Sequence, residues 1–261
     1  MIYDYEYFKA EVYKITSIDL SAYKEKQMKR RIDTLISRHH IQGYDAFVKE
    51  LRNNNEILEE FVNYLTINVS EFYRNPEQWA ILEKEVLPLL SERFKPDIKI
   101  WSAACSTGDE PYTISMIFSK YMNKKDYSIY ATDIDKQVLL IAEEGVYNNK
   151  ALAGLPAEYL TKHFSKTWDE NYKVDPMIKS TIKFQKHNLL LDPFPKNLSL
   201  IVCRNVLIYF TEETKEIIFR KFYESLAPGG ILFLGATEQM MNYKDIGYIR
   251  KASFFFEKPM R

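Results

Sequence analysis

The residues of this chain that could hold a small ligand are concentrated in the stretch 101–115. A short apolar run, 98–101, predicts a strand, and small residues follow it from 102 to 108. Asp109, Glu110 and the next residue, a proline, then predict a helix start, because acids favour the first turn and proline's missing N–H costs nothing there. This layout is typical of a nucleotide-type site, where small side chains let the backbone approach a ligand closely.

The chemistry of this stretch favours a cationic ligand. No Gly-Lys-Ser/Thr follows, so the phosphate-binding P-loop is excluded, and Gly108 stands alone where a dinucleotide fingerprint has three glycines. Asp109 and Glu110 would repel a pyrophosphate but attract a sulfonium or an ammonium. We therefore infer S-adenosylmethionine rather than NAD or ATP. The alternative is an ordinary turn between a strand and a helix.

The amino-acid composition indicates which kinds of partner and which cellular compartment to expect. Basic and acidic residues number 36 each, so any electrostatic partner must be met by a local patch. Two distant cysteines, Cys105 and Cys203, predict a reducing compartment and a packing role for both thiols. The N-terminus lacks a signal-peptide pattern, and no apolar run is long enough to predict a membrane span. The four histidines predict no metal site.

Hydrophobic periodicity predicts two structural parts. Residues 1 to about 90 are predicted to be all helix, and from residue 97 strands and helices alternate, which predicts a parallel sheet covered by helices. The strand candidates are 97–101, 127–132, 181–186, 198–203 and 230–235, and the helix candidates are 110–122, 135–144 and 212–226. Residues 254–257 predict a further, antiparallel edge strand. The interval 146–180 lacks a clear period and predicts a small inserted subdomain.

Polar residues follow the predicted strands, where an open α/β sheet binds its ligand. Asp133 follows Gly108 by the spacing that places a carboxylate on ribose hydroxyls, roughly 20 residues. Asn188 and Leu189 would suit an adenine, and Asn205 could hold an amino or carboxyl group. Each has an ordinary alternative as a helix cap or a turn residue, but their repetition at successive strand ends favours a site.

The predicted second helix, 20–40, has an unusually basic polar side. Its cations exceed its acids by four; they are Lys24, Lys26, Lys29, Arg30, Arg31 and Arg38, against Glu25 and Asp33. One interpretation is a solvated helix face, and the other is a docking surface for an acidic partner. A polar linker, 66–74, carries Asn68 and Arg74 and ends at Asn75, which predicts the cap of a further helix.

Several motifs in order resemble the CheR-type chemotaxis receptor methyltransferases, which are protein-glutamate O-methyltransferases. They are TINVSEFYRN, IWSAACSTGDEPYT, ATDID, HNLL, CRNVLIYF and LAPGGILFLGATE, from residue 66 to about 238, and YKEKQMKRRIDTLISRHHI resembles the family's receptor-contacting helices. The resemblance implies a helical receptor-docking domain with its linker, 1–75. It also implies a Rossmann-like methyltransferase domain, 76–261, with an inserted β subdomain near 146–180.

The same resemblance implies the cofactor and its site. S-adenosylmethionine would leave as S-adenosylhomocysteine, and the carried-over cofactor-binding positions are Asn68, Ser70, Arg74, Glu110, Asp133, Asn188, Leu189, Asn205 and Val206. Arg74 and Tyr209 are the predicted catalytic residues, with Tyr209 near the transferred methyl. Lys26, Lys29, Arg30, Arg31 and Arg38 would dock the acidic methylation helices of membrane chemoreceptors.

Other consequences concern partners. Some family members grip a receptor pentapeptide with a glycine-rich loop, but residues 164–184 contain no glycine, so no pentapeptide tether is expected. We expect a cytoplasmic monomer without membrane insertion or nucleic acid. Two alternatives stay open. Asp192-Pro193-Phe194-Pro195 resembles the signature of adenine N-methylation, although it precedes the fourth strand instead of following it. A non-catalytic receptor-binding scaffold is the other alternative.

Overall fold

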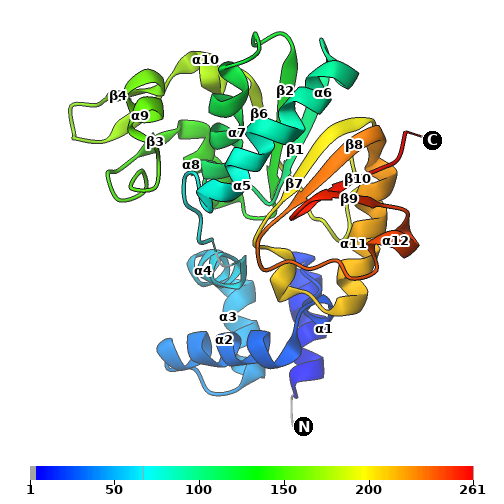
Figure 1. The fold of residues 1–261 in the computed structure, drawn as a ribbon. Helices are drawn as coiled ribbons and strands as arrows, with labels where there is room; N and C mark the ends of the chain where they lie inside the picture. The colour runs from blue at the N-terminus through cyan, green and yellow to red at the C-terminus, as the bar shows by residue number, and fades with distance from the viewer. Residues whose placement is uncertain (1–3, 67, 261) are drawn as a thin grey trace. The chain divides into compact units, whose positions relative to one another are not determined.

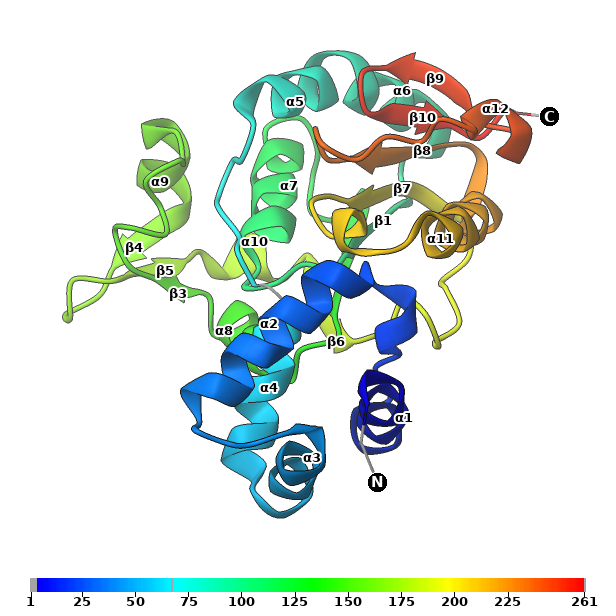
Figure 2. The ribbon, with the colours of Figure 1, turned by 90° about the horizontal axis from the view of Figure 1, so that it is seen from below.

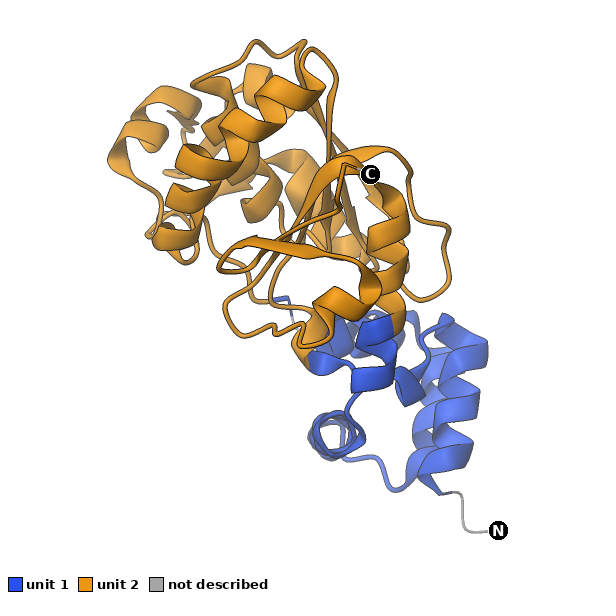
Figure 3. Ribbon diagram, turned by 45° about the vertical axis from the view of Figure 1, so that its right-hand side comes forward, with its two compact units in different colours: residues 1–68, 209–216 blue, residues 69–208, 217–261 orange. Residues whose placement is uncertain are grey.

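The chain forms two compact units (Figures 1 and 3). The computed structural model describes residues 4–66 and 68–260. The first unit comprises residues 1–68 together with 209–216, and the second comprises 69–208 and 217–261. The sequence predicted a division after residue 75. In the structure the linker 69–75 belongs instead to the second unit, and a short segment from the C-terminal half returns to the first.

In the described part of residues 4–66, the first unit has four helices and a 3-10 turn, 20–22. The helices are α1 (Tyr5–Thr16), α2 (Glu25–Arg38), α3 (Tyr44–Asn53) and α4 (Asn55–Thr66). The spacing of Tyr5, Phe8, Val12 and Ile15 predicts one apolar face for α1; the first three are buried and Ile15 is half-buried. Phe8 packs on Phe47 and Phe61, with ring centroids 6.2 and 6.1 Å apart, and these rings form an aromatic core. The predicted helix over 20–40 is shorter than expected, because the 3-10 turn precedes α2.

The returning segment 209–216 completes this unit by backbone pairing. The N–H of Lys24 donates to the carbonyl of Tyr209 at 2.9 Å, and the N–H of Thr211 donates to the carbonyl of Ala22 at 2.9 Å. Tyr23 and Phe210 form an isolated antiparallel bridge, and their rings lie 4.7 Å apart. The first unit is therefore discontinuous in sequence.

A seven-stranded sheet organises the second unit. Its strands are β1 (Ile98–Ala103), β2 (Tyr127–Asp133), β6 (Ile182–Lys186), β7 (Leu198–Cys203), β8 (Leu226–Leu234), β9 (Ile249–Ala252) and β10 (Phe255–Glu257). They lie in the order β6-β2-β1-β7-β8-β10-β9. The first five are parallel, which confirms the predicted alternation of strand and helix. β10 is antiparallel to β8 as predicted, but the edge strand is β9.

Helices cover both faces of the sheet (Figure 2). α7 (Asp109–Ser119) packs on one face together with α5 (Pro76–Ile81) and α6 (Leu87–Phe94), which a π-helical turn, 82–86, joins. α8 (Lys136–Glu144) also packs along β2 and β6. On the other face, Phe222 of α11 (Glu212–Ser225) packs against Trp101 of β1 with ring centroids 5.5 Å apart. Helical spacing after residue 75 predicts an apolar face, and its members are buried: Trp79, Leu82, Val86, Leu87 and Leu90.

The interval 146–180 forms the predicted inserted subdomain. It contains a three-stranded antiparallel sheet of β3 (Val146–Tyr147), β5 (Tyr172–Val174) and β4 (Phe164–Lys166), with α9 (Ala157–His163) and α10 (Pro176–Lys179). A last short helix, α12 (Tyr243–Ile246), precedes β9. Among the residues that the structure describes, no helix combines the length and apolarity needed to cross a membrane.

Candidate active site

The carboxyl ends of four parallel strands meet at one edge of the sheet. β6, β2, β1 and β7 are neighbours in that order, and each is followed directly by a predicted site residue or by the loop that carries one. The chain leaves β1 toward β2 on one side and returns at β7 on the other. The point between β1 and β7 is therefore a topological switch point, where open α/β sheets bind ligands.

The loop between β1 and α7 is tightly wound. Ala104 and Ser106 have left-handed backbones, with φ of 71° and 47°, and Gly108 has φ of 93°. The N–H groups of Ala104 and Cys105 both donate to the carbonyl of Thr132 at 2.8 Å, which fastens the loop to the end of β2. A Cβ on Gly108 would lie 2.9 Å from the hydroxyl of Tyr147, so the single glycine of this loop is required by space as well as by φ.

Asp133 ends β2 and is 6% exposed. Its Oδ2 accepts the N–H of Ser106 at 2.8 Å, and its Oδ1 accepts the N–H of Asp135 at 3.0 Å. Burial raises the pKa of Asp133 to about 6, although these backbone donors oppose the shift. A carboxylate has about four lone-pair sites, so Asp133 retains capacity for further donors such as ribose hydroxyls.

Glu110 lies in the first turn of α7 beside the end of β1. Its Oε1 accepts the hydroxyl of Ser102 at 2.8 Å, and its Oε2 lies 3.9 Å from Nη1 of Arg204. Burial raises the pKa of Glu110 to about 7, against the opposing influence of Arg204 and Ser102. Asp109, next to it, is also buried, and burial raises its pKa. Glu110 is thus an acid whose charge depends on its cationic neighbours near neutral pH.

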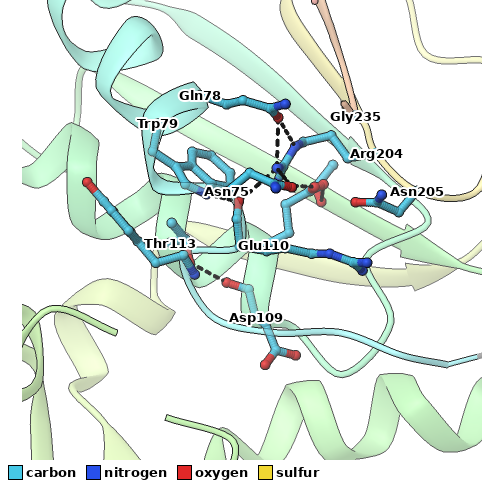
Figure 4. Close-up of polar contacts among 12 residues, drawn as sticks. Asn75, Gln78, Trp79, Asp109, Glu110, Thr113, Arg204, Asn205 and Gly235 are labelled. Atoms are coloured by element: carbon cyan, nitrogen blue, oxygen red, sulfur yellow. Dashed lines mark hydrogen bonds and ion pairs between the residues drawn. The ribbon is translucent and has the colours of Figure 1, made fainter. Parts of the chain in front are cut away.

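Arg74 is held in a strained loop before α5. The residues on either side, Tyr73 and Asn75, both have left-handed backbones, with φ of 57° and 58°. The carbonyl of Arg74 accepts Nη2 of Arg204 at 2.8 Å and Nε1 of Trp79 at 2.9 Å; Figure 4 labels Arg204 and Trp79. Asn75 occupies the predicted cap position of α5, but its side chain makes no capping bond and instead accepts from Arg204 at 3.3 Å.

A buried acid shapes the loop after β7. Glu238, 4% exposed, accepts four backbone N–H groups at 2.7–2.9 Å, those of Asn205, Val206, Leu207 and Gly235. Asn205 has φ of 64°, a conformation that asparagine tolerates. A Cβ on Gly235 would lie 2.7 Å from Oε2 of Glu238, so glycine is required there. The predicted site residues Asn205 and Val206 therefore depend on Glu238 for their placement.

The loop after β6 is built from its own side chains. Oδ1 of Asn188 accepts the N–H of Leu190 at 2.9 Å, and Oδ2 of Asp192 accepts the N–H of Asn188 at 2.7 Å. Leu189 is buried, and Phe194 packs on Trp101 with ring centroids 4.8 Å apart. Asp192 and Phe194 thus have structural roles, which weakens the adenine N-methylation interpretation of that segment.

Three further predicted site residues are divided between the two units. Ser70 belongs to the second unit, and its hydroxyl bonds to the carboxylate of Asp109. Asn68 and Tyr209 belong to the first unit, where the amide of Asn68 donates to Oγ1 of Thr66 at 3.0 Å. The strand ends therefore bring together the second-unit residues of the prediction, whereas Asn68 and Tyr209 remain predictions.

The two cysteines are packing residues, as the sequence predicted. Cys105 and Cys203 are both buried, and burial raises the pKa of each thiol, which disfavours the nucleophilic thiolate. Within the described ranges, 4–66 and 68–260, no cluster of three or more His, Cys, Asp or Glu could hold a metal ion.

Comparison with known proteins decides the family. Residues 3–66 match the model described as CheR methyltransferase, all-alpha domain, and residues 68–255 match CheR methyltransferase, SAM binding domain. The chain belongs to the CheR methyltransferase family. It is similar to the chemotaxis protein methyltransferase of Listeria monocytogenes, with 41% identity covering 98% of this chain and 97% of that protein. It is also similar to that of Borreliella burgdorferi, with 32% identity covering 93% and 90%.

S-adenosylmethionine is accordingly the cofactor of this CheR methyltransferase. The residues present fit it: the strand ends hold carboxylates, Asp133 and Glu110, that suit hydroxyl and ammonium groups, and Arg74, whose backbone carbonyl bonds Arg204 beside them, has a guanidinium of the type that suits a carboxylate. Two buried polar atoms at this edge, Oγ of Ser106 and Nε2 of Gln78, lack a hydrogen-bond partner among the described residues. Such unpaired donors are the kind of group that a polar ligand satisfies.

Sequence reasoning missed three contributors to this site, namely Ser102, Arg204 and Glu238. Glu238 follows the fifth strand closely, so the argument applied to the other strand ends could have included it. Ser102 and Arg204 directly follow the predicted strands 97–101 and 198–203, so the same argument could have included them, although the bonds of Arg204 to the distant segment 74–78 could not be predicted from its position.

Proposed function

We propose that this CheR methyltransferase transfers the methyl group of S-adenosylmethionine to glutamate side chains of membrane chemoreceptors, the methyl-accepting chemotaxis proteins, and so serves chemotactic adaptation. The observation that carries the proposal is similarity over nearly the whole chain to proteins named chemotaxis protein methyltransferase. The strand-end arrangement of Asp133, Glu110 and Asn205 is consistent with it. The reaction class is protein-glutamate O-methylation.

The chain's own residues would bind and orient the cofactor. Asp133 would accept hydroxyls of the ribose, and Leu189 with Asn188 would cover the adenine. Glu110 would attract the ammonium of the methionine moiety, and Arg74 its carboxylate. Asn205, Val206, Asn68, Ser70 and Tyr209 would line the remaining contacts, with Tyr209 near the methyl.

The chemistry demands little beyond positioning. The cofactor supplies a methyl group on a sulfonium, which becomes a neutral thioether on transfer. The receptor glutamate, with a reference pKa of about 4.3, is already ionised, so a carboxylate oxygen forms the new C–O bond and no proton has to be removed. Holding the two reactants in line is then the main source of rate, with an effective molarity worth roughly 7–11 kcal/mol at best.

α2 would dock the receptor through an exposed basic face. Lys26, Lys29 and Arg30 are exposed and line a shallow groove along this helix together with Asp33, Thr34 and Ser37. Two other cations of the predicted surface, Arg31 and Arg38, lie against α4. Their guanidinium carbons are 4.4 and 5.3 Å from the ring centroid of Tyr64. We therefore assign docking mainly to the first three, which would attract acidic methylation helices.

Receptor binding would not use a pentapeptide tether. The β4–β5 turn contains no glycine and is cross-linked by its own side chains: Oγ1 of Thr167 donates to the carbonyl of Asn171 at 2.9 Å, and the amide of Asn171 donates to Asp169 at 2.9 Å. We also propose that the protein acts as a monomer in the cytoplasm and binds no nucleic acid.

The test is to incubate the purified protein with methyl-labelled S-adenosylmethionine and receptor-containing membranes, and then to treat the product with base. Label released from the receptor as methanol is the expected result, because carboxyl methyl esters are base-labile. Label that resists base, or that appears only when nucleic acid is added, would contradict the proposal. Cofactor binding without any transfer would favour a non-catalytic scaffold.

A further inference from the structure

Arg204 is, like Glu238, a heavily bonded side chain beside the strand ends, yet neither the family resemblance nor the mechanism gives it a role. Its side chain is 3% exposed, and its guanidinium carbon lies 4.8 Å from the ring centroid of Trp79 and 5.0 Å from that of Phe233. Burying a cation is costly unless its charge and its donors are matched. The groups that bond Arg204 therefore show which part of the structure this buried cation stabilises.

Most of those partners belong to the segment that carries Arg74. Nη2 donates to the carbonyl of Arg74 at 2.8 Å, and both Nε and Nη2 donate to Oε1 of Gln78, at 3.2 and 2.9 Å. The backbone on either side of Arg74 is left-handed, so this loop needs external bonds to keep its shape. Trp79 supplies one and Thr113, which accepts the N–H of Tyr73 at 3.3 Å, supplies another, while Arg204 bonds the carbonyl of Arg74 and the side chains of Asn75 and Gln78.

The charged partner of Arg204 is Glu110, on a different element. Their closest atoms, Nη1 and Oε2, are 3.9 Å apart, which is an ion pair but too long for a hydrogen bond. Oε2 can therefore still accept a hydrogen bond from an ammonium group. Three other polar or charged groups influence the Glu110 carboxylate: Ser102 bonds it from β1, Asp109 lies beside it on α7, and Glu238 acts on it from beyond β8.

We propose that Arg204 is a positioning residue of the cofactor site: a single guanidinium fixes the backbone of Arg74 and the carboxylate of Glu110 together, and so sets the end of the site that takes the cofactor's methionine moiety. The inference rests on the proposed function only for the roles of Arg74 and Glu110. A lysine could supply the charge but not the planar fork that reaches Gln78 and Arg74 at once.

The positioning role of Arg204 predicts a change in how cofactor affinity depends on pH. Burial raises the pKa of Glu110 to about 7, and Arg204 opposes that rise. If Arg204 is replaced, the pKa of Glu110 moves further up and its ionised form becomes rarer at neutral pH. Affinity for a ligand carrying an ammonium should then rise with pH over a higher range than in the wild type.

The experiment measures S-adenosylhomocysteine binding by calorimetry between pH 6 and 8.5 on the full chain. We expect Arg204→Lys to raise Kd at least tenfold at pH 7.5 and to move the midpoint of the pH dependence upward. Arg93→Lys is the matched control, because Arg93 bonds the carbonyl of Gly229 at 2.9 Å and pairs with Glu257 at 3.3 Å. Its Kd and midpoint should match the wild type.

A folded Arg204→Lys variant with unchanged Kd and midpoint would overturn the inference. If that variant does not fold, Gln78→Leu decides the question. It removes the acceptor of Nε and Nη2 while leaving Glu110 in place, and it should raise Kd at least threefold; no change would overturn the inference. Receptor methylation by the wild type, measured in parallel, separates the two proposals, since its failure would leave the binding results intact.

Discussion

Buried carboxylates whose partners are mostly backbone N–H groups characterise this site at the scale of single residues. Asp133 and Glu238 both lie at strand ends, and both hold a loop in place. Such acids satisfy backbone donors and so fix the shape of a loop: Asp133 keeps capacity for further donors, whereas the four N–H groups on Glu238 use its acceptor sites. Their replacement should therefore separate structural effects from effects on ligand binding.

Asp133→Ala should raise the Kd for S-adenosylhomocysteine at least tenfold, since it removes the acceptor that we assign to the ribose. In the wild type, the pKa of Asp133 is raised to about 6, so affinity should fall as the pH drops below about 6 and the carboxylate is protonated. Calorimetry across pH 5–8 measures both effects. Asp175→Ala, which removes the cap of α10, should leave Kd unchanged, and an unaltered Kd in Asp133→Ala would refute the ribose assignment.

Glu238→Gln should lower both stability and cofactor affinity. The amide nitrogen would face backbone donors that now bond a carboxylate oxygen, and each unsatisfied buried group costs about 1–3 kcal/mol. Glu257→Gln is the control, because Glu257 is also buried, but pairs with Arg93 and Lys251. Denaturant unfolding should show a lower free energy of unfolding for both variants, whereas only Glu238→Gln should weaken S-adenosylhomocysteine binding. If both variants bound S-adenosylhomocysteine equally well, Glu238 would have no role in the cofactor site.

At the scale of helices and strands, some features could be predicted from the sequence and others could not. Helices with an apolar stripe and strands bounded by turn residues were predictable, because burial of one face dictates their period. Asn75 illustrates the opposite case: its type predicted a helix cap, but its amide bonds Arg204, which is distant in sequence. The network around Arg204 and the role of Glu238 depend on contacts between residues far apart in the sequence. No local pattern encodes such contacts.

Some basic side chains of α2 pack against neighbouring residues, and others are exposed to solvent. Arg31 donates to the carbonyl of Tyr64 and is half-buried, so charge reversal there would disturb the fold. Reversal of the exposed residues, Lys26→Glu with Lys29→Glu and Arg30→Glu, is the cleaner variant. We expect it to lower kcat/KM for receptor methylation at least tenfold at low salt, with a smaller loss as salt rises.

The control for α2 is reversal of Lys124 and Lys125, which are also exposed but lie after α7. It should leave receptor methylation near the wild-type rate, and both variants should bind S-adenosylhomocysteine normally. If the α2 variant methylates receptors as fast as the control at low salt, α2 is a solvated face and not a docking surface.

The whole molecule consists of two units that the chain links more than once. Sequence patterns separated a helical part from a strand-rich part, but they gave no sign that residues 209–216 return to the first. That segment has the composition of a loop and helix start, and only its pairing with residues 22–24 assigns it.

Phe210→Ala should destabilise the first unit selectively. Phe210 is buried and packs on Tyr23, and Phe→Ala changes at buried sites typically cost about 3–5 kcal/mol. Hydrogen exchange should show loss of protection in α1 and α2 while the sheet strands keep theirs. Phe222→Ala, which removes a ring packed on Trp101, should show the reverse pattern. Uniform loss of protection in both variants would mean that the units unfold as one.

The return of residues 209–216 has a consequence during synthesis. The four N-terminal helices leave the ribosome first, but the segment that pairs with residues 22–24 follows roughly 150 residues later, about 7–30 s at 5–20 residues per second. During that interval the nascent helices lack Phe210, the aromatic neighbour of Tyr23. The part of the protein that is translated first is therefore completed only when most of the chain has been made.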